Sequence, residues 1–342
     1  MRRQIGQFFF VISLFLSFSV QSQVRKYTFQ RPKMGSPFII MAYTDDSLKL
    51  SAAIQKAYQQ VDTLNQIFSD YSTTSEISLL CKNAKKGEWY TVSAELFKIL
   101  DLSLKAAKVS KGAYDVTVGN VVKLWRKARK EHQYPNQQAL NIALSKTGWR
   151  HIDLQKSDDS KTGKIRFHTE GVELDFGGIV KGYAAQKTID ILRAEGFSIC
   201  LADAGGDLAM GENPPNTEGW SVGISLPQSD NQLLSKFLYL KNQVVATSGD
   251  MYNYLEINGK RYSHIVNPKT GVGLTHQRNV TIIAPDGALA DWLATACSVL
   301  SIKKALRLVK QYRGADLLIL ENNKGKIKMY QSPDFSRYFF AH

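Results

Sequence analysis

Cysteine is scarce in this sequence. The chain of 342 residues contains three cysteines, Cys81, Cys200 and Cys297, which lie far apart. An odd number of cysteines without a CxxC pair gives no support to a disulfide framework or a zinc site. Cys200 and Cys297 lie in apolar segments and are predicted to be core residues. The P-loop and the three-glycine dinucleotide fingerprint are also missing, so these common nucleotide-binding motifs do not describe the chain.

Long hydrophobic runs are missing too, except near the start. The apolar run from Phe8 to Val20 is too short to span a bilayer comfortably and fits the central part of a signal peptide. Val20-Gln21-Ser22 resembles a cleavage site, which predicts a signal peptide over residues 1–22 and a mature protein over residues 23–342. An uncleaved anchor is the alternative. Because the first cysteine is Cys81, no lipidated cysteine can follow this signal, and we expect an exported protein.

Acidic residues are outnumbered by basic ones. The chain has 44 Lys and Arg against 30 Asp and Glu, a formal net charge of +14. Removing residues 1–22 takes away only Arg2 and Arg3, which leaves +12. The basic residues are scattered and not clustered with aromatic residues, so no nucleic-acid partner is expected. A solvated basic surface, with some attraction for anionic ligands or a membrane surface, is the simpler interpretation.

The order of periodic segments predicts an α+β fold. Apolar residues recur at helical spacing from Leu50 to Phe68, and Ser93 can cap a second helix that ends at Gly112. A third helix ends near Gly196, and two more are expected over 288–300 and 302–312. The strands are predicted over 38–44, 165–168, 172–175, 220–226, 237–246, 252–257, 261–266, 280–284, 317–320 and 326–330.

Turn signals connect these strands into hairpins. Asn258-Gly259 and the turn over 322–325 are hairpin signals, and residues 126–150 are interpreted as a polar surface excursion broken at Pro135-Asn136. Hairpins combined with grouped helices predict a single compact unit of mainly antiparallel sheets flanked by helices.

The stretch from Asp175 to Ala184 suggests a ligand site. It places a carboxylate after an apolar strand, then Gly177 and Gly178, then Lys181 at the start of a helix. The two glycines let backbone groups approach a ligand closely. A helix N-terminus points free N–H groups at an anion, so the stretch has the layout of a phosphate or nucleotide site.

Two further groups carry chemistry in this sequence. Asp291 and Thr295 share one face of a predicted helix among small apolar residues, and their oxygens suit a hard cation such as Mg²⁺. A helix cap or a salt bridge of Asp291 is the alternative interpretation. His264 lies beside a turn and is placed for general base work, although a structural histidine is also consistent with the sequence.

The order of the motifs carries more information than any one of them. Together they are similar to the ApbE family, the FAD:protein FMN transferases, over about residues 30–340. The matching motifs are Met34-Gly-Ser-Pro-Phe38, Phe68-Ser-Asp-Tyr71, Ser75-Glu-Ile-Ser78, Gly112-Ala-Tyr-Asp115, Thr117-Val-Gly119, the Asp175 stretch, AGGD at 204–207, TSGD at 247–250, HIVNPKTG at 264–271 and ADWLATA at 290–296.

The resemblance implies an ApbE-like, T-fold-like domain and a defined reaction. FAD binds in a cleft with Mg²⁺ at its diphosphate. A Ser or Thr hydroxyl of an acceptor flavoprotein attacks the phosphorus on the riboflavin side, and AMP leaves. The acceptor is expected to be a respiratory or other extracytoplasmic flavoprotein. The location implied is the periplasm or the outer face of the inner membrane.

The resemblance also assigns the site residues. It implies that Gly178, Asp291 and Thr295 are the metal ligands and that His264 is the base that deprotonates the acceptor hydroxyl. The residues that it places against FAD are Met34, Tyr71, Ala113, Tyr114, Asp115, Asp175, Lys181 and Ile265.

The chain departs from the family pattern at three positions. Ser36 stands where Thr is common, Val180 where Ala is frequent, and Asn267 where Asp is common. Asn267 removes a charge beside His264. None of these changes removes a metal ligand, so activity is expected. Two alternatives stay open: an FAD pyrophosphatase that gives FMN and AMP, and a periplasmic flavin-binding protein without turnover.

Overall fold

The computed structural model describes residues 24–157, 162–227, 232–249 and 253–339. The predicted signal peptide, Asp250 of the TSGD motif and Tyr252 of one predicted strand lie outside these ranges. Within them, none of the helices combines the length and the apolar character that crossing a bilayer requires.

An antiparallel sheet is the centre of the described structure. Its eight strands follow the order β1-β2-β6-β7-β10-β13-β14-β15, and each neighbouring pair is antiparallel. The strands are β1 (Arg25–Lys33), β2 (Ser36–Thr44), β6 (Cys200–Ala204), β7 (Leu208–Met210), β10 (Val244–Ser248), β13 (Gln277–Ala284), β14 (Asp316–Asn323) and β15 (Lys326–Gln331). The mainly antiparallel α+β prediction is confirmed.

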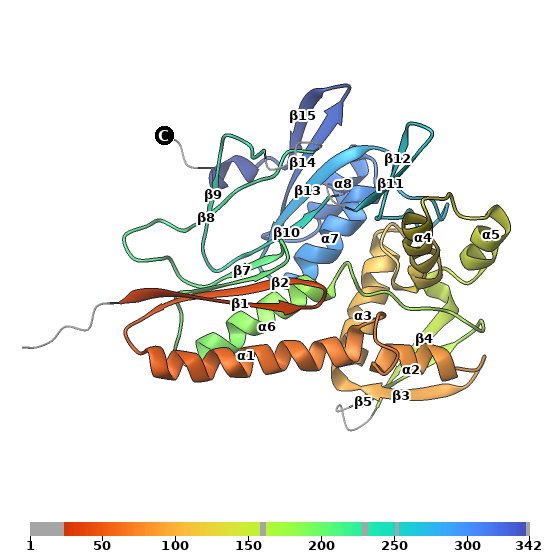
Figure 1. Cartoon of the computed structure of the whole chain (residues 1–342), viewed down its shortest axis with the longest axis horizontal. Helices are drawn as coiled ribbons and strands as arrows, with labels where there is room; N and C mark the ends of the chain where they lie inside the picture. Colours follow the sequence, from red (N-terminus) through yellow and green to blue (C-terminus); the bar gives the residue numbers. More distant parts are fainter. Residues whose placement is uncertain (1–23, 158–161, 228–231, 250–252, 340–342) are drawn as a thin grey trace, which may run out of the picture.

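Helices cover one face of this sheet (Figure 1). α6 (Val180–Ala194) and α7 (Gly287–Val299) lie against the strands, α1 (Ser47–Phe68) lies along α6, and α8 (Ile302–Val309) follows α7. The predicted apolar face of α1 is fully buried in this core, and Asp46 caps the helix by accepting a hydrogen bond from the Lys49 N–H at 2.9 Å. The period of 3.6 residues thus predicted the buried side of α1 correctly.

The other sheet face packs against short elements. These are β8 (Trp220–Val222), β9 (Leu238–Leu240) and the 3-10 helix η3 (Phe335–Tyr338). Side chains alternate along β2 because successive strand residues point to opposite faces: Phe38 and Ile40 enter the helix-side core, whereas Met41 and Tyr43 pack against the second cluster.

A second group of elements lies beside the sheet, to the right in Figure 1. It comprises α2 (Glu76–Asn83), β3 (Trp89–Ser93), α3 (Ala94–Val109), η1 (Val116–Val118), α4 (Gly119–Glu131), α5 (Gln137–Ser145), η2 (Trp149–His151), β4 (Ile152–Lys156), β5 (Thr162–Phe167), β11 (Tyr254–Ile257) and β12 (Lys260–Ser263). Ser93 caps α3 as predicted, with its hydroxyl accepting from the Leu96 N–H. One hydrophobic cluster continues from the sheet into this group, which makes the core continuous.

Several predicted strands are shorter in the structure or missing. Residues 172–175 form no strand, because their backbone bonds to the segment before α4: the Asp175 N–H donates to the Val116 carbonyl and the Gly119 N–H to the Glu173 carbonyl. The predicted strand over 237–246 is two strands, divided at Asn242, which has a φ of 51°. A residue in the left-handed region ends the extended backbone there.

The prediction of a surface excursion over 126–150 is also wrong. α4 and α5 occupy most of it, and their buried face, including Trp125 and Leu140, packs against Leu255 and Val266 in a separate small core. Pro135-Asn136 is the break between the helices, as predicted, and Asn136 caps α5. Basic residues on the exposed side of α4 hide this apolar face from a composition-based interpretation.

Candidate active site

The predicted metal ligands meet where the start of α6 lies against α7. Gly178 packs against Thr295: a Cβ on Gly178 would lie 2.5 Å from the Thr295 Oγ1, so a larger residue does not fit. Four residues later along the chain, the Gly182 N–H donates to the Asp291 Oδ2 at 3.1 Å. The two helices can approach this closely because Gly182 and Gly287 face each other without side chains.

The electrostatics of Asp291 are those of a group that needs a cation. Burial raises the pKa of its carboxyl to about 7, against the opposing effect of the Gly182 N–H and Lys181. Burial, followed by repulsion from Asp291, raises the pKa of Asp207 well above its usual value. A divalent cation would offset the cost of two buried carboxylates.

The donor set of this region fits Mg²⁺. The Asp291 carboxylate, the Thr295 hydroxyl and the backbone at Gly178 offer the oxygen atoms that a hard cation prefers. Within the described ranges, no group of three or more His, Cys, Asp or Glu side chains is placed to hold an ion. An ion here would therefore depend on hydroxyl and backbone oxygens as well as on a carboxylate.

The AGGD turn brings a second set of polar groups to this region. A Cβ on Gly205 would clash with the Ser36 hydroxyl and lie 3.7 Å from the Lys181 Nζ. The Asp203 Oδ1 accepts from the Gly206 N–H at 2.7 Å. The Ser36 hydroxyl is buried without a hydrogen-bond partner in the described structure, and an orphaned hydroxyl at this point is available to a ligand. Met34, in the β1–β2 turn with a φ of 50°, lies two residues away from it in the chain.

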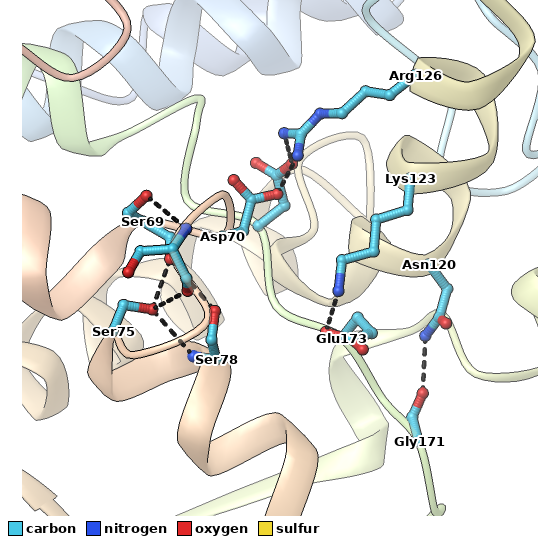
Figure 2. Close-up of polar contacts among 11 residues, drawn as sticks. Ser69, Asp70, Ser75, Ser78, Asn120, Lys123, Arg126, Gly171 and Glu173 are labelled. Atoms are coloured by element: carbon cyan, nitrogen blue, oxygen red, sulfur yellow. Dashed lines mark hydrogen bonds and ion pairs between the residues drawn. The ribbon is translucent and has the colours of Figure 1, made fainter.

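Arg126 connects Asp175, which is predicted to contact FAD, with the motif that contains Asp70 and Tyr71. Its guanidinium forms ion pairs with Asp70 and, at 3.1 Å, with the Asp175 Oδ2. It also lies over the Tyr71 ring, 4.2 Å from the centroid. The Tyr71 side chain is 78% exposed, so its other face is free to stack on a planar ligand. Figure 2 shows Arg126 of α4 reaching toward Asp70.

Further polar contacts hold the segments around Asp70 and Asp175 in place (Figure 2). Lys123 pairs with the Glu173 Oε2 at 2.7 Å, and the Asn120 amide donates to the Gly171 carbonyl at 2.8 Å. Both bonds fasten the segment before Asp175 to α4. On the other side, the Ser75 hydroxyl donates to the Ser69 carbonyl at 2.5 Å, which holds the turn that carries Asp70 and Tyr71.

The His264 loop packs on α4 through Trp125. The buried Trp125 indole N–H donates to the Gly271 carbonyl at 2.7 Å, and its ring packs against Tyr262 of β12 with centroids 5.3 Å apart. The His264 Nδ1 lies 3.1 Å from the Asn253 carbonyl. Because a carbonyl can only accept, Nδ1 carries the proton and Nε2 is left as the basic nitrogen. Burial, with the nearby Arg129 and other cations, lowers the pKa of His264 to about 4.

The run from Ala113 to Asp115 is buried and makes internal contacts. Asp115 accepts hydrogen bonds from the Thr117 N–H at 3.0 Å and the Trp149 N–H at 2.8 Å, which caps η1. The Tyr114 hydroxyl lies 3.3 Å from the Ser103 Oγ. The three residues thus shape the scaffold next to the site, and a direct contact with FAD stays a prediction. The half-buried Ile265 follows His264, and its carbonyl accepts from the Leu274 N–H.

The structure thus brings the predicted metal ligands together and connects Tyr71 to Asp175. The sequence alone assigns no role to four charged residues in this region, Asp70, Arg126, Asp203 and Asp207. The three carboxylates lie in or next to motifs quoted from the sequence, whereas Arg126 had no signal of its own. Its partners lie 56 and 49 residues away in the chain.

Known proteins resemble this chain over most of its length. A model described as the ApbE family matches residues 34–319. The chain belongs to the ApbE family. An FAD:protein FMN transferase of Klebsiella pneumoniae is 30% identical over 312 residues, which is 89% of this chain and 87% of the relative. A solved ApbE protein of Thermotoga maritima has a TM-score of 0.80 at 27% identity, covering 93% of this chain and 100% of that one. The flavin transferase ApbE of Vibrio cholerae, at 22% identity over 92% of this chain and 100% of its own, has the same fold with a TM-score of 0.81.

Proposed function

We propose that this ApbE protein is an FAD:protein FMN transferase. It would transfer the FMN moiety of FAD to a Ser or Thr hydroxyl of an acceptor flavoprotein and release AMP. The observation that carries the proposal is the contact of Gly178 with Thr295, beside an Asp291 that is bonded to the start of α6. This contact occurs in a chain that aligns with most of the length of relatives named FAD:protein FMN transferase.

Gly178, Asp291 and Thr295 are the residues that would hold Mg²⁺. When bound, this ion would neutralise diphosphate charge that positioning alone cannot offset. The Lys181 Nζ would lie 3.7 Å from a Cβ on Gly205, in the turn that ends at Asp207, and its charge opposes the rise that burial causes in the pKa of Asp207 and Asp291. Its ammonium can approach the diphosphate as well. The orphaned Ser36 hydroxyl supports a polar ligand group at this point.

The protein groups around the metal ligands supply orientation and base catalysis. The exposed Tyr71 ring, supported from behind by Arg126, offers a stacking surface for a ring of FAD. His264 is neutral at pH 7 because of its lowered pKa. Its Nε2 can therefore accept the proton of the attacking hydroxyl without first losing one of its own. The Trp125–Gly271 hydrogen bond holds the loop that carries this base.

Export completes the proposal. The basic start and the apolar run from Phe8 to Val20 support a signal peptide over residues 1–22. We place the mature protein in the periplasm or at the outer face of the inner membrane, where its net charge of +12 favours anionic surfaces. The acceptor would then be a respiratory or other extracytoplasmic flavoprotein.

A transfer assay tests this function. The purified protein is incubated with FAD, Mg²⁺ and a candidate acceptor flavoprotein, and the acceptor is examined by mass spectrometry for a covalent FMN increment. Release of free FMN without labelling would favour the pyrophosphatase instead. Tight FAD binding with no turnover on any acceptor would favour a flavin-binding protein.

Asp291→Ala is the matched variant for the metal ligands. We expect it to lose Mg²⁺-dependent turnover, because it removes the buried carboxylate that offers charge to the ion. The exposed carboxylate of Asp190, replaced in Asp190→Ala, is the control and should leave the rate unchanged. Equal rates for wild type and Asp291→Ala would remove the metal assignment.

A further inference from the structure

One face of α4 points its basic residues toward the proposed site. Trp125 and Arg129 are four residues apart, and Arg126 and Arg129 are three apart, so the three side chains share one side of the helix. Trp125 contacts the loop after β12 that begins with His264. Arg126 lies over Tyr71. Arg129 follows about one turn further along α4 and is close enough to Tyr71 and His264 to interact electrostatically with both.

Arg129 is half-buried and its charge is unmatched, whereas Lys130, the other cation of α4 without an ion pair in the described structure, is exposed. Lys123 pairs with Glu173, Arg126 with two aspartates, and Lys127 with Glu131. In the part of the chain that the structure describes, Arg129 has no ion pair and no hydrogen bond, although it is half-buried. Burial, followed by repulsion from Arg126, lowers the pKa of Arg129. A guanidinium has five N–H donors, and none of those of Arg129 has a protein acceptor within the described ranges. Taking its charge partly out of water costs free energy, which a bound anion would offset.

The charges around Arg129 point to the anion that it would take. Asp207 and Asp291 are buried, and Asp203 accepts from the Gly206 N–H in the same turn, where the Lys181 Nζ would lie 3.7 Å from a Cβ on Gly205. These three carboxylates outnumber Lys181. Arg126 is already shared by two carboxylates. A dication would offset the charge of Asp203, Asp207 and Asp291, but a diphosphate bound beside them would bring further negative charge. Two cations near His264, Arg129 and Lys181, have no ion pair within the described residues. Lys181 lies at the turn that carries Asp203 and Asp207, and Arg129 has the larger effect on the His264 pKa.

We propose that Arg129 binds the phosphate group of FAD on the riboflavin side, beside His264. The proposal rests on the transferase function above and adds a residue on α4 to the binding site. A guanidinium suits this task because its planar fork donates two parallel hydrogen bonds to phosphate oxygens. At that position it also holds the phosphorus within reach of the hydroxyl that His264 would deprotonate, and it stabilises charge that grows on the phosphate oxygens.

Flavin titrations test the proposal without relying on turnover. Dissociation constants for FAD, FMN and riboflavin are measured by flavin fluorescence, with and without Mg²⁺, for wild type, Arg129→Gln, Arg129→Lys and Lys127→Gln. We expect Arg129→Gln to weaken FAD and FMN about tenfold or more, the usual effect of losing a charged hydrogen bond. Riboflavin, which has no phosphate, should bind as it does to wild type. Arg129→Lys should lie in between, and Lys127→Gln, whose parent side chain is 69% exposed, should match wild type.

Three results would overturn the proposal. Equal weakening of FAD and riboflavin would mean that Arg129 supports the ring site or the fold. Unchanged flavin affinities with lost transfer to the acceptor would mean that Arg129 contacts the acceptor protein. Unchanged affinities with unchanged transfer would mean that its charge has no role in the site. Thermal melting identifies an unfolded glutamine variant, in which case the FMN-to-riboflavin affinity ratio of Arg129→Lys decides. The transfer assay of the wild type tests the proposed function, and the flavin titrations test the role of Arg129. The titrations can therefore be interpreted even if the wild type shows no transfer.

Discussion

Replacing Arg126 by methionine should destabilise the protein by leaving two carboxylates without their cation. In the structure, Arg126 joins Asp70 and Asp175, and the side chains are 24%, 13% and 11% exposed. Methionine keeps much of the side-chain volume and can still contact the Tyr71 ring. The change therefore removes charge and hydrogen bonds more than packing.

The size of the effect follows from this burial. Exposed ion pairs contribute about 0–1 kcal/mol, whereas breaking a fully buried pair costs about 3–5 kcal/mol. These side chains are mostly but not fully buried, so we expect Arg126→Met to lower the free energy of unfolding by about 2–3 kcal/mol. For a chain of this size, that corresponds to a melting temperature lower by roughly 3–5 °C.

The loss should depend on pH in a defined direction. Burial, followed by repulsion from Asp70, already raises the pKa of Asp175, and Arg126 opposes this rise. Without Arg126, the pKa of Asp175 in the folded state should rise further above its unfolded value. The folded variant then takes up a proton more readily than the unfolded chain, so acidification favours folding. The difference between variant and wild type should shrink as the pH falls from 7 toward 5.

Urea denaturation followed by tryptophan fluorescence measures this effect. Lys127→Met, one residue further along α4, is the matched control because Lys127 is 69% exposed and pairs with Glu131 at 3.8 Å. It should stay within about 0.5 kcal/mol of wild type. Adding Asp70→Asn to Arg126→Met should restore part of the loss by removing one unpaired carboxylate. Equal midpoints for Arg126→Met and Lys127→Met would refute the reasoning.

Three further predictions concern the metal ligands, the loop and the base. Gly178→Ala places a methyl group 2.5 Å from the Thr295 Oγ1, so we expect at least a tenfold loss of Mg²⁺-dependent transfer. Titrating the transfer rate with Mg²⁺ measures this loss. An unchanged rate and an unchanged Mg²⁺ requirement would contradict the prediction. Trp125→Phe leaves the Gly271 carbonyl without the indole N–H that donates to it at 2.7 Å. We expect this change to lower the free energy of unfolding by about 1–3 kcal/mol and to slow transfer more than it weakens FAD binding. A stability equal to that of wild type would argue against this role. Because the pKa of His264 is about 4, the base stays neutral as the pH falls from 8 to 5. At saturating Mg²⁺, which keeps Asp291 ionised, kcat/KM should therefore show no acid limb near pH 6.5 in wild type. A limb there that disappears in His264→Gln would show that the base titrates normally.

Local sequence was a good guide wherever one element decides the outcome. The buried face of α1, the cap at Ser93, and the shared helix face of Asp291 and Thr295 all follow from spacing within one segment. The extended segment before Asp175 has the alternation of a strand but forms none. Alternation describes which side chains are buried, and the backbone partner comes from elsewhere in the chain.

The sequence by itself determined the α+β class and the family, because these depend on short motifs and their order. Tertiary structure decided how the motifs combine. Gly178 reaches Thr295 because α6 and α7 approach closely through Gly182 and Gly287. Arg126 joins Asp70 to Asp175 because α4, interpreted from sequence as a polar excursion, packs its apolar face inward. The unmatched charge of Arg129 exists only in that arrangement, since pairing depends on distances in space that no local pattern encodes.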